Sequence, residues 1–448
     1  MFNVNKSILA ALLQYPTSVF WIAYSGGLDS QVLLHASAAV LPAARLRAIH
    51  VNHNWRSEAA AWAETCQRRC AQLGIHCAVI VVDAQPKHGE SLEACAREAR
   101  YAAMETLLPA GDCLLTAHHR DDQAETLLLQ LLRGAGLRGL SGMPACMALG
   151  KAYLIRPLLP FTRAELRQYA EAEQLIWVED DSNTNLRFSR NFVRHQVLPL
   201  LLQRWPAVNK ILARVADNTA EAQQLLEELA CEDYVKVQGP SPNNVVISRL
   251  SQLHPARRRN CLRYWLNQLH VSPPSQQQLK QVEYLLKSKR DAVPQVNWGN
   301  VQVRRYQDLL YVLRLQKGVE LPDLPILWDL QHSVTLSTIG ILTVTRVIGC
   351  GIACKKLKES MEVPVVTIAL RQGGERFWTK GRLGSHPLKK LFQEWQIPPW
   401  QRQKVPLLYH QGKLIAVVDY GVHPNFLASA DEWGYVVSLK KCKSSDLI

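Results

Sequence analysis

The sequence has few of the features that mark secreted or metal-rich proteins. None of its eleven cysteines stands in a C-x-x-C pair, which argues against a zinc site and against an iron–sulfur cluster. Eleven cysteines in 448 residues are also too sparse for a secreted disulfide scaffold, so we expect reduced thiols. The closest pairs, Cys66 with Cys70 and Cys350 with Cys354, have the spacing of neighbours on one helical face, where buried packing is the common role.

Long apolar runs are absent as well. Every such run is interrupted by charge well short of the ~20 residues that a membrane-spanning helix needs. The apolar stretch between Ile8 and Ala23 contains Pro16 and has no small-residue cleavage site after it, so it is predicted to belong to the fold and not to a signal peptide. We therefore expect a cytoplasmic protein with no membrane partner.

Acidic residues are outnumbered by basic ones. The 52 lysines and arginines exceed the 38 aspartates and glutamates, which gives a net charge of +14. An excess of this size favours a polyanionic partner, with nucleic acid ahead of an acidic membrane surface. With 48% hydrophobic and 20% charged residues the chain is globular, and at ~100–200 residues per domain its length allows about two to four domains.

The N-terminal part of the chain has the pattern of a parallel α/β sheet. From Val19 to about Ala117, short β-branched runs alternate with longer segments of helical spacing. Strands are predicted at 19–24, 46–52, 77–83 and 112–117, with helices that begin near Ser30, Ser57 and Ser91. Ligands bind beyond the carboxyl ends of the strands in such sheets, so the residues after the first, second and fourth strands are the first candidates for chemistry.

The later part of the chain is predicted to form two smaller α+β domains. After Phe161 the pattern becomes helical, and the proline-bearing stretches at 238–244 and 321–326 are typical of domain boundaries. We expect three domains, at 1–215, 216–320 and 321–448.

The first predicted strand runs directly into a glycine turn that opens a helix, formed by Ser25, Gly26, Gly27, Leu28, Asp29 and Ser30. Glycines let the backbone point successive N–H groups at a ligand, and the helix dipole favours negative charge, so phosphate or pyrophosphate fits. Asp29 is anionic where an anion-binding loop disfavours it unless a cation bridges it to phosphate, which predicts Mg²⁺ there. A serine-capped turn without a ligand is the alternative for two glycines alone.

Two other nucleotide-binding loops are excluded. No G-x-x-x-x-G-K-[ST] sequence occurs, so there is no Walker A loop. The segment 134–139 fits G-x-G-x-x-G, but it follows a predicted helix and no acid lies about 20 residues further on, so it is not a dinucleotide fingerprint. Its neighbours Arg133 and Arg138 are expected to meet a phosphate backbone or to close over the site.

A second polar cluster follows the fourth predicted strand. Asp122 and Glu125 share a helical face next to His118 and His119. An acid followed three residues later by glutamate is also a capping box, which is the purely structural interpretation. Beside a phosphate loop, however, two carboxylates can hold Mg²⁺ or accept a proton from an attacking amine.

Taken together, these motifs resemble the tRNA(Ile)-lysidine synthetases, a family of PP-loop ATP pyrophosphatases. The resemblance follows the same order through 19–200 and rests on the turn at 25–30, His50 with His53, the runs 117–126, 133–143, 156–159 and 180–183, and Arg190, Asn191, Arg194 and His195. The segment 388–392 resembles the family's C-terminal domain more loosely. One departure is Asn54-Trp55, where members commonly carry Gly-Leu, and it leaves the local loop shape open.

The resemblance implies a fold and a reaction. The fold is the doubly wound parallel sheet of the adenine nucleotide α-hydrolase type. ATP adenylates the C2 oxygen of the first anticodon cytidine in a CAU-bearing isoleucine tRNA, and free L-lysine then attacks C2 and releases AMP. The turn at 25–30 and His50 are expected to bind ATP, Asp29 to bind Mg²⁺, and Asp29, Asp122 and Glu125 to be catalytic.

A tRNA substrate also needs basic surface beyond the catalytic site. We expect tRNA contacts from Arg133, Arg138, Arg190, Arg194, Arg257, Arg258, Lys389 and Lys390. Leu388, Leu391 and Phe392 have the spacing of a buried helical face, which leaves Lys389 and Lys390 on the solvated side. The alternatives are a tRNA thiolase, a nucleotide-amidating enzyme of the same superfamily, or a non-catalytic RNA-binding protein. A homodimer is compatible with the sequence, which does not fix the oligomeric state.

Overall fold

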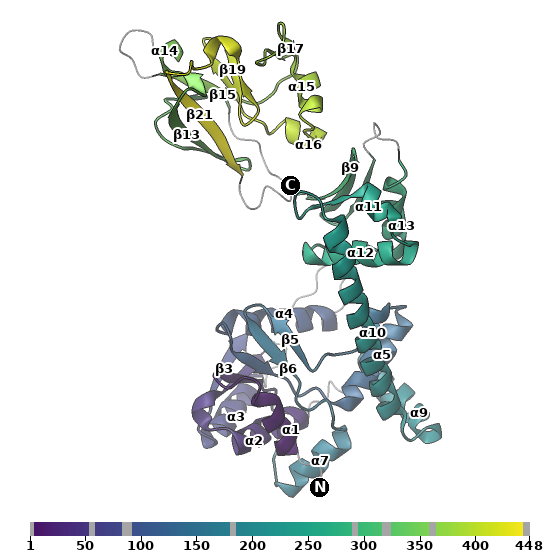
Figure 1. Cartoon of the computed structure of the whole chain (residues 1–448). Coiled ribbons are helices and arrows are strands. Elements are labelled where there is room, and N and C mark those ends of the chain that lie inside the picture. The colour runs from purple at the N-terminus through teal and green to yellow at the C-terminus, as the bar shows by residue number, and fades with distance from the viewer. Residues whose placement is uncertain are drawn as a thin grey trace. The chain divides into compact units, whose positions relative to one another are not determined.

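The structure, a computed structural model, describes residues 4–52, 59–82, 92–179, 185–288, 294–315, 324–357 and 364–441. Contacts divide the chain into two compact units, Met1–Leu226 and Glu227–Ile448. Figure 1 shows the chain coloured from its N-terminus to its C-terminus. No helix among the described residues is long and apolar enough to cross a membrane.

The first unit is built on one six-stranded sheet of order β3-β2-β1-β4-β6-β5. Its strands are β1 (Phe20–Ala23), β2 (Leu46–Asn52), β3 (His76–Val81), β4 (Cys113–Leu115), β5 (Cys146–Leu149) and β6 (Ala152–Ile155). Neighbouring strands are parallel except β5, which forms an antiparallel hairpin with β6. The predicted parallel sheet is therefore confirmed, with one antiparallel edge strand added.

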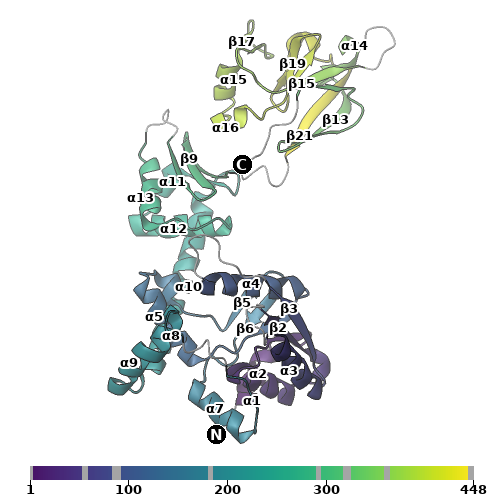
Figure 2. The ribbon, with the colours of Figure 1, turned by 180° about the vertical axis from the view of Figure 1, so that it is seen from behind.

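Helices cover both faces of this sheet. On one face, α1 (Val4–Leu12), α2 (Leu28–Val40), α3 (Ala59–Gln72) and α7 (Arg163–Ala172) contribute to one apolar core with the strands. On the other face, α4 (Leu92–Leu107) packs Met104 against Ile49, Leu114 and Leu154. Figures 1 and 2 show the sheet between these two layers. The chain thus winds to one side of β1 through α2 and α3 and returns through α4, as a doubly wound sheet requires.

Two predicted helix starts lie outside the described residues. Ser57 and Ser91 fall there, and the helices begin nearby, at Ala59 for α3 and at Leu92 for α4. The helix after the glycine turn begins at Leu28, two residues earlier than the predicted start near Ser30. Asp29 consequently lies within the first turn of α2 and not in the loop before it.

A further helical layer is formed by segments that follow β4 and β6 in the chain. It contains α5 (Arg120–Leu132), α6 (Leu137–Leu140), α8 (Ser189–Phe192), a π-helical turn (Val193–Val197), α9 (Leu198–Arg204) and α10 (Val208–Val237). Ala124 of α5 packs on Val193 and Leu198 in a small core. The π-helical turn joins α8 to α9 without a break, and such turns often occur at functional sites.

The second unit begins within α10 and contains two regions with cores of their own. In the first, α11 (Ile247–Gln252), α12 (Pro255–Gln268) and α13 (Gln276–Leu285) pack on an antiparallel sheet around Trp265. That sheet has the order β7 (Asn244–Val246), β10 (Leu309–Arg314), β9 (Val301–Tyr306) and β8 (Gln295–Trp298).

The C-terminal region is β-rich. One sheet has the order β11 (Ile326–Trp328), β15 (Val366–Ala369), β18 (Leu407–His410), β19 (Lys413–Val417) and β20 (Gly421–Val422), and another the order β12 (Val334–Leu336), β13 (Gly340–Ile348), β21 (Trp433–Lys441) and β14 (Ile352–Ala353). The short elements are α14 (Cys354–Leu357), β16 (Arg376–Phe377), β17 (His386–Pro387), α15 (Leu388–Glu394) and α16 (Pro399–Arg402). Two further small domains after the parallel sheet were expected, and these two regions agree with that expectation.

The predicted domain boundaries stay a prediction. The boundary between 215 and 216 falls inside α10, as does the division of contacts after Leu226. The boundary between 320 and 321 lies outside the described residues. A continuous helix at the first junction explains why neither proline nor glycine marks it in the sequence.

We predict that Trp265→Ala destabilises the region around α12. The indole is fully buried and donates to the Pro242 carbonyl at 2.8 Å, so its removal leaves both a cavity and an unpaired acceptor. Truncation should lower the free energy of unfolding by ~3–5 kcal/mol. Urea unfolding followed by circular dichroism measures this. The control is Tyr284→Ala on the neighbouring helix α13, because Tyr284 is 72% exposed, and this variant should cost ~0.5 kcal/mol or less. Equal costs for the two variants would contradict the central place of Trp265 in this core.

Candidate active site

The glycine turn is shaped by its serines and by a tight packing contact. The backbone N–H of Ser25 and the Ser25 hydroxyl both approach Ser30 Oγ, at 3.2 and 3.0 Å, and Ser30 Oγ donates to the Gly27 carbonyl at 3.0 Å. Gly26 has a φ of +81°, and a Cβ there would lie 2.7 Å from Trp62 Nε1 and 2.9 Å from Cys66 Sγ. Only glycine satisfies both constraints.

The start of α2 has no side-chain cap. Gly27 is the N-cap residue, so the first N–H groups of the helix have no side-chain oxygen of the cap to accept them. Leu28 is buried in the core below and anchors the first turn. Exposed donors at a helix N-terminus favour an anionic ligand, and here they follow directly on the strand edge where ligands of such sheets bind.

Asp29 is the acidic residue of this helix start. Its Oδ2 atom lies 3.7 Å from Nε2 of His119, while its Oδ1 atom is buried and has no hydrogen-bond partner among the described residues. An orphaned carboxylate oxygen beside a phosphate loop fits a hard cation such as Mg²⁺. The described residues contain no group of three or more potential ligands of a metal ion.

The three histidines near the sheet edge have different surroundings. Nδ1 of His50 lies 2.9 Å from the Tyr24 carbonyl, and burial lowers the pKa of this imidazole. His118 pairs through Nδ1 with the Thr116 hydroxyl at 2.9 Å, and burial lowers its pKa to about 3. Burial also disfavours a charge on His119, but the carboxylates of Asp122 and Asp29 outweigh it and raise its pKa. Only His119 of the three is therefore favoured as a cation.

His119 also joins the glycine turn to the second polar cluster. It is the N-cap of α5, where its Nδ1 atom accepts from the Asp122 backbone at 3.4 Å. Asp122 Oδ2 accepts from the His119 backbone at 3.0 Å and lies 3.4 Å from its Nε2 atom. The capping box thus consists of His119 and Asp122, and not of Asp122 and Glu125. The helix begins at Arg120, so Glu125 lies beyond the capping positions.

Asp122 and Glu125 lie in a buried cluster with two arginines. Arg190 donates from Nε to Glu125 at 2.8 Å and from Nη2 to Asp122 at 3.1 Å. Arg194 donates from Nε to Glu125 at 2.5 Å and from Nη2 to Asp122 at 2.9 Å. Burial alone would raise the pKa of Asp122, but the charges of His119 and Arg190 hold it well below its usual value. Asp122 is accordingly ionised at neutral pH.

The pairing gives Arg190 and Arg194 a role that sequence reasoning missed. They come from α8 and the π-helical turn after it, four residues apart, so both side chains lie on one face. That spacing predicts two cations on one face, but no local signal in the sequence identifies Asp122 and Glu125 as their partners. Contacts of these two arginines with tRNA remain a prediction.

The other predicted tRNA contacts lie on several elements. Arg133 and Arg138 are exposed at the end of α5 and on α6. Arg257 pairs with Asp233 through two hydrogen bonds of 2.9 and 2.6 Å, and Arg258 pairs with Glu283 at 3.2 Å. Part of the hydrogen-bonding capacity of these last two side chains is therefore used within the fold.

Lys389 and Lys390 lie on the exposed side of α15. Leu388, Leu391 and Phe392 on the same helix are fully buried, as the helical spacing predicted. The basic surface of α15 is therefore available to a polyanion.

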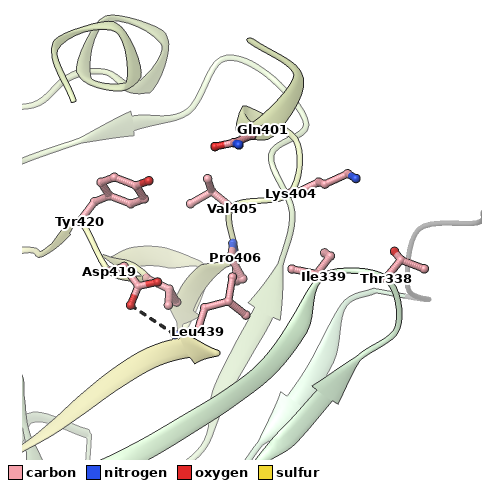
Figure 3. Close-up of a pocket in the computed structure, with 10 residues that line it drawn as sticks. Thr338, Ile339, Gln401, Lys404, Val405, Pro406, Asp419, Tyr420 and Leu439 are labelled. Atoms are coloured by element: carbon pink, nitrogen blue, oxygen red, sulfur yellow. Dashed lines mark hydrogen bonds between the residues drawn. The ribbon is translucent and has the colours of Figure 1, made fainter. Parts of the chain in front are cut away.

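A pocket in the same C-terminal region is lined by Lys404, Tyr420 and mostly apolar side chains (Figure 3).

Comparison with protein families covers most of the chain. Residues 2–201 match a model described as a PP-loop domain. Residues 246–311 match the TilS substrate binding domain, and residues 366–439 match the TilS substrate C-terminal domain. The three matches follow one another in the order expected from the resemblance.

Curated relatives match along nearly the whole length. A protein named tRNA(Ile)-lysidine synthase from Coxiella burnetii is 43% identical over 430 residues, which cover 95% of this chain and 94% of the relative. A protein of the same name from Alkalilimnicola ehrlichii is 42% identical over 417 residues, 92% of either chain. Another, from Serratia proteamaculans, is 41% identical and covers 89% of this chain and 90% of its own. With this identity sustained across both sequences, the chain belongs to the tRNA(Ile)-lysidine synthase family.

Proposed function

We propose that this protein is a ligase that joins free L-lysine to C2 of the first anticodon cytidine in a CAU-bearing isoleucine tRNA. ATP drives the reaction through an adenylated cytidine. The observation that carries the proposal is the position of His119, whose Nε2 atom lies 3.7 Å from Asp29 and 3.4 Å from Asp122. One imidazole thereby holds the phosphate-binding helix start and the acidic cluster at the same edge of the sheet.

The first half of the reaction needs an ATP site that stabilises a leaving pyrophosphate. The C2 oxygen of the cytidine attacks the α-phosphorus, and the bond to the β-phosphate oxygen breaks. Ser25, Ser30 and the N–H groups at Gly27 would donate to the phosphates. Asp29 would hold Mg²⁺, which supplies positive charge to offset the departing pyrophosphate. His50 would support this wall of the site through its contact with the Tyr24 carbonyl.

The second half of the reaction needs a lysine side chain near the activated base. The lysine amine attacks C2, and AMP leaves with the C2 oxygen. Asp122 and Glu125 would attract the ammonium group. Because its pKa is held far below the usual value, Asp122 binds a cation better than it removes a proton, so positioning of the lysine ammonium is the role that suits it. The proton that the ammonium loses before the amine attacks C2 would pass to water.

Thiolation is disfavoured by the cysteines near the turn. Cys66 lies against Gly26, but it is fully buried and burial raises the pKa of its thiol to about 12. A thiol in this state is a weak nucleophile and a poor sulfur carrier.

The proposed lysine transfer needs ATP, lysine and tRNA together, so we propose that the protein acts in the cytoplasm. A homodimer stays a prediction.

The decisive measurement is ATP-dependent transfer of labelled lysine to tRNA. We expect label in an isoleucine tRNA transcript with a CAU anticodon, and none when the target cytidine is changed to uridine, because uridine lacks the exocyclic amine that distinguishes the substrate base. When ATP carries the label instead, AMP and pyrophosphate should form in step with lysidine. Transfer of sulfur or ammonia in place of lysine would contradict the proposal.

We predict that Asp29→Asn weakens binding of ATP in the presence of Mg²⁺ while preserving the fold. The amide keeps the shape of the side chain but loses the charge that a cation needs. Isothermal titration should show an affinity for ATP that rises with Mg²⁺ in the native protein and changes little in the variant. Lysine transfer should fall by at least about a hundredfold. An unchanged Mg²⁺ dependence would remove Asp29 as the metal ligand.

We predict that replacing Lys389 and Lys390 with glutamine weakens tRNA binding and its dependence on salt. If each lysine meets a phosphate, the slope of log Kd against log salt concentration should fall by about 1–2. Filter binding at several salt concentrations measures it. The matched control is the double arginine variant, which keeps both charges and should keep the slope. A slope unchanged in the glutamine variant would show that α15 does not contact the tRNA backbone.

A further inference from the structure

Arg156 is a buried cation that no part of the mechanism above uses. It follows β6 directly, and 5% of the residue is exposed. Its Nη1 atom donates to the Pro144 carbonyl at 2.6 Å, and Nη2 lies 3.7 Å from the sulfur of Met147. Its Nε atom is buried without a hydrogen-bond partner, and no carboxylate among the described residues pairs with it. A buried guanidinium without a counter-charge is costly, and an anionic ligand would offset that cost.

The surroundings of Arg156 are positive. Arg97 on α4 acts electrostatically on Arg156, and its guanidinium lies 5.3 Å from the ring centre of Tyr101. The Tyr101 side chain in turn hydrogen-bonds to Arg156. Since α4 runs from the carboxyl edge of the sheet back to the amino edge, Arg97 in its first half lies near the carboxyl edge, as does Arg156.

This positive site is on the face of the sheet away from the glycine turn. Leu154 packs with Met104 of α4, whereas Ile155 packs in the core with α2. Side chains alternate along a strand, so Arg156 continues on the α4 side. The phosphate-binding turn leads into α2 on the opposite side. Arg156 is therefore poorly placed for the triphosphate.

His118 connects this site to the acidic cluster. The Thr116 backbone N–H donates to the Ile155 carbonyl at 3.0 Å, so His118 and Arg156 follow the neighbouring ends of β4 and β6. The charges of Asp122 and Arg156 both act on the His118 ring. With its pKa near 3, the imidazole is neutral at physiological pH. A neutral ring between a cationic and an anionic group can contact the methylenes of a substrate that carries opposite charges at its two ends.

We propose that Arg156, supported by Arg97, binds the α-carboxylate of the amino-acid substrate, whose side-chain ammonium extends past His118 toward Asp122 and Glu125. This rests on the proposed function and adds to it a specificity site for an amino acid over a simple amine. A guanidinium binds a carboxylate through two parallel hydrogen bonds, and the free Nε donor provides one of them.

The test compares lysine with 1,5-diaminopentane, which is lysine without its carboxylate, in the full-length protein. The native protein should use lysine with a kcat/KM about ten- to a hundredfold higher. Arg156→Gln should lower kcat/KM for lysine by a similar factor, chiefly through KM, and leave the value for the diamine within about twofold. Arg47→Gln is the matched control, because Arg47 also donates to backbone carbonyls but lies near the amino end of β2.

Several results would overturn the inference. Equal losses for lysine and the diamine would make Arg156 a purely structural residue that anchors Pro144. A raised KM for ATP with an unchanged KM for lysine would make it a phosphate ligand. Should Arg156→Gln not fold, Arg156→Lys provides the same comparison with the charge kept and the second hydrogen bond lost. Failure of the proposed function itself is distinguishable, because the native protein would then transfer neither amine to tRNA.

Discussion

The active site depends on the balance of charge around His119. Three carboxylates, from Asp29, Asp122 and Glu125, meet two guanidiniums, from Arg190 and Arg194, so one further positive charge brings the group to neutrality. A protonated His119, which its raised pKa favours, would supply it, at the loss of the acceptor that Nδ1 offers to the Asp122 N–H in the neutral ring. Ionised groups this deeply buried persist only when each is paired. The pairing therefore fixes α2, α5 and α8 relative to one another at the edge of the sheet.

The same balance makes the cluster responsive to substrates. In the proposed function, nucleotide phosphates would add negative charge beside Asp29, and a lysine ammonium would add positive charge beside Asp122 and Glu125. Arg190 and Arg194, now paired with those two carboxylates, are the groups that can follow the change, since their side chains are 20% and 22% exposed whereas Glu125 is 1% exposed. An arginine released from a carboxylate can turn to a phosphate without leaving the site. On this proposal, the two half-reactions would be coupled through one set of ion pairs.

Much of this arrangement could be predicted from the sequence, and what could not has physical reasons. The strand, glycine turn and helix at 20–40 follow from local patterns, because hydrophobic alternation and glycine geometry act over a few residues. The pairing of Glu125 with Arg190 spans 65 positions, so no local spacing reveals it. The capping box suggested by the sequence, Asp122 with Glu125, lies three residues after the one in the structure, His119 with Asp122. Histidine is an unusual N-cap, so its role appears only once Asp122 is seen to face it. The contact of Trp62 and Cys66 behind Gly26 was equally hidden, as it depends on how α3 packs.

The sheet itself separates the two anions that this chemistry must handle. In the proposed function, phosphate would bind on the α2 side, where the backbone N–H groups of the glycine turn and the start of α2 carry only partial charges and a bound cation could be shared with Asp29. A carboxylate suits the α4 side, where Arg156 presents a full charge with an unused donor. Had both anions shared one face, each would have competed for the same cations, and a guanidinium would bind phosphate at least as well as carboxylate. The strand between them removes that competition, because alternate residues of β6 cannot reach the same side. The edge where β4 and β6 end is then the one place at which an amine held on one side can meet a base activated on the other.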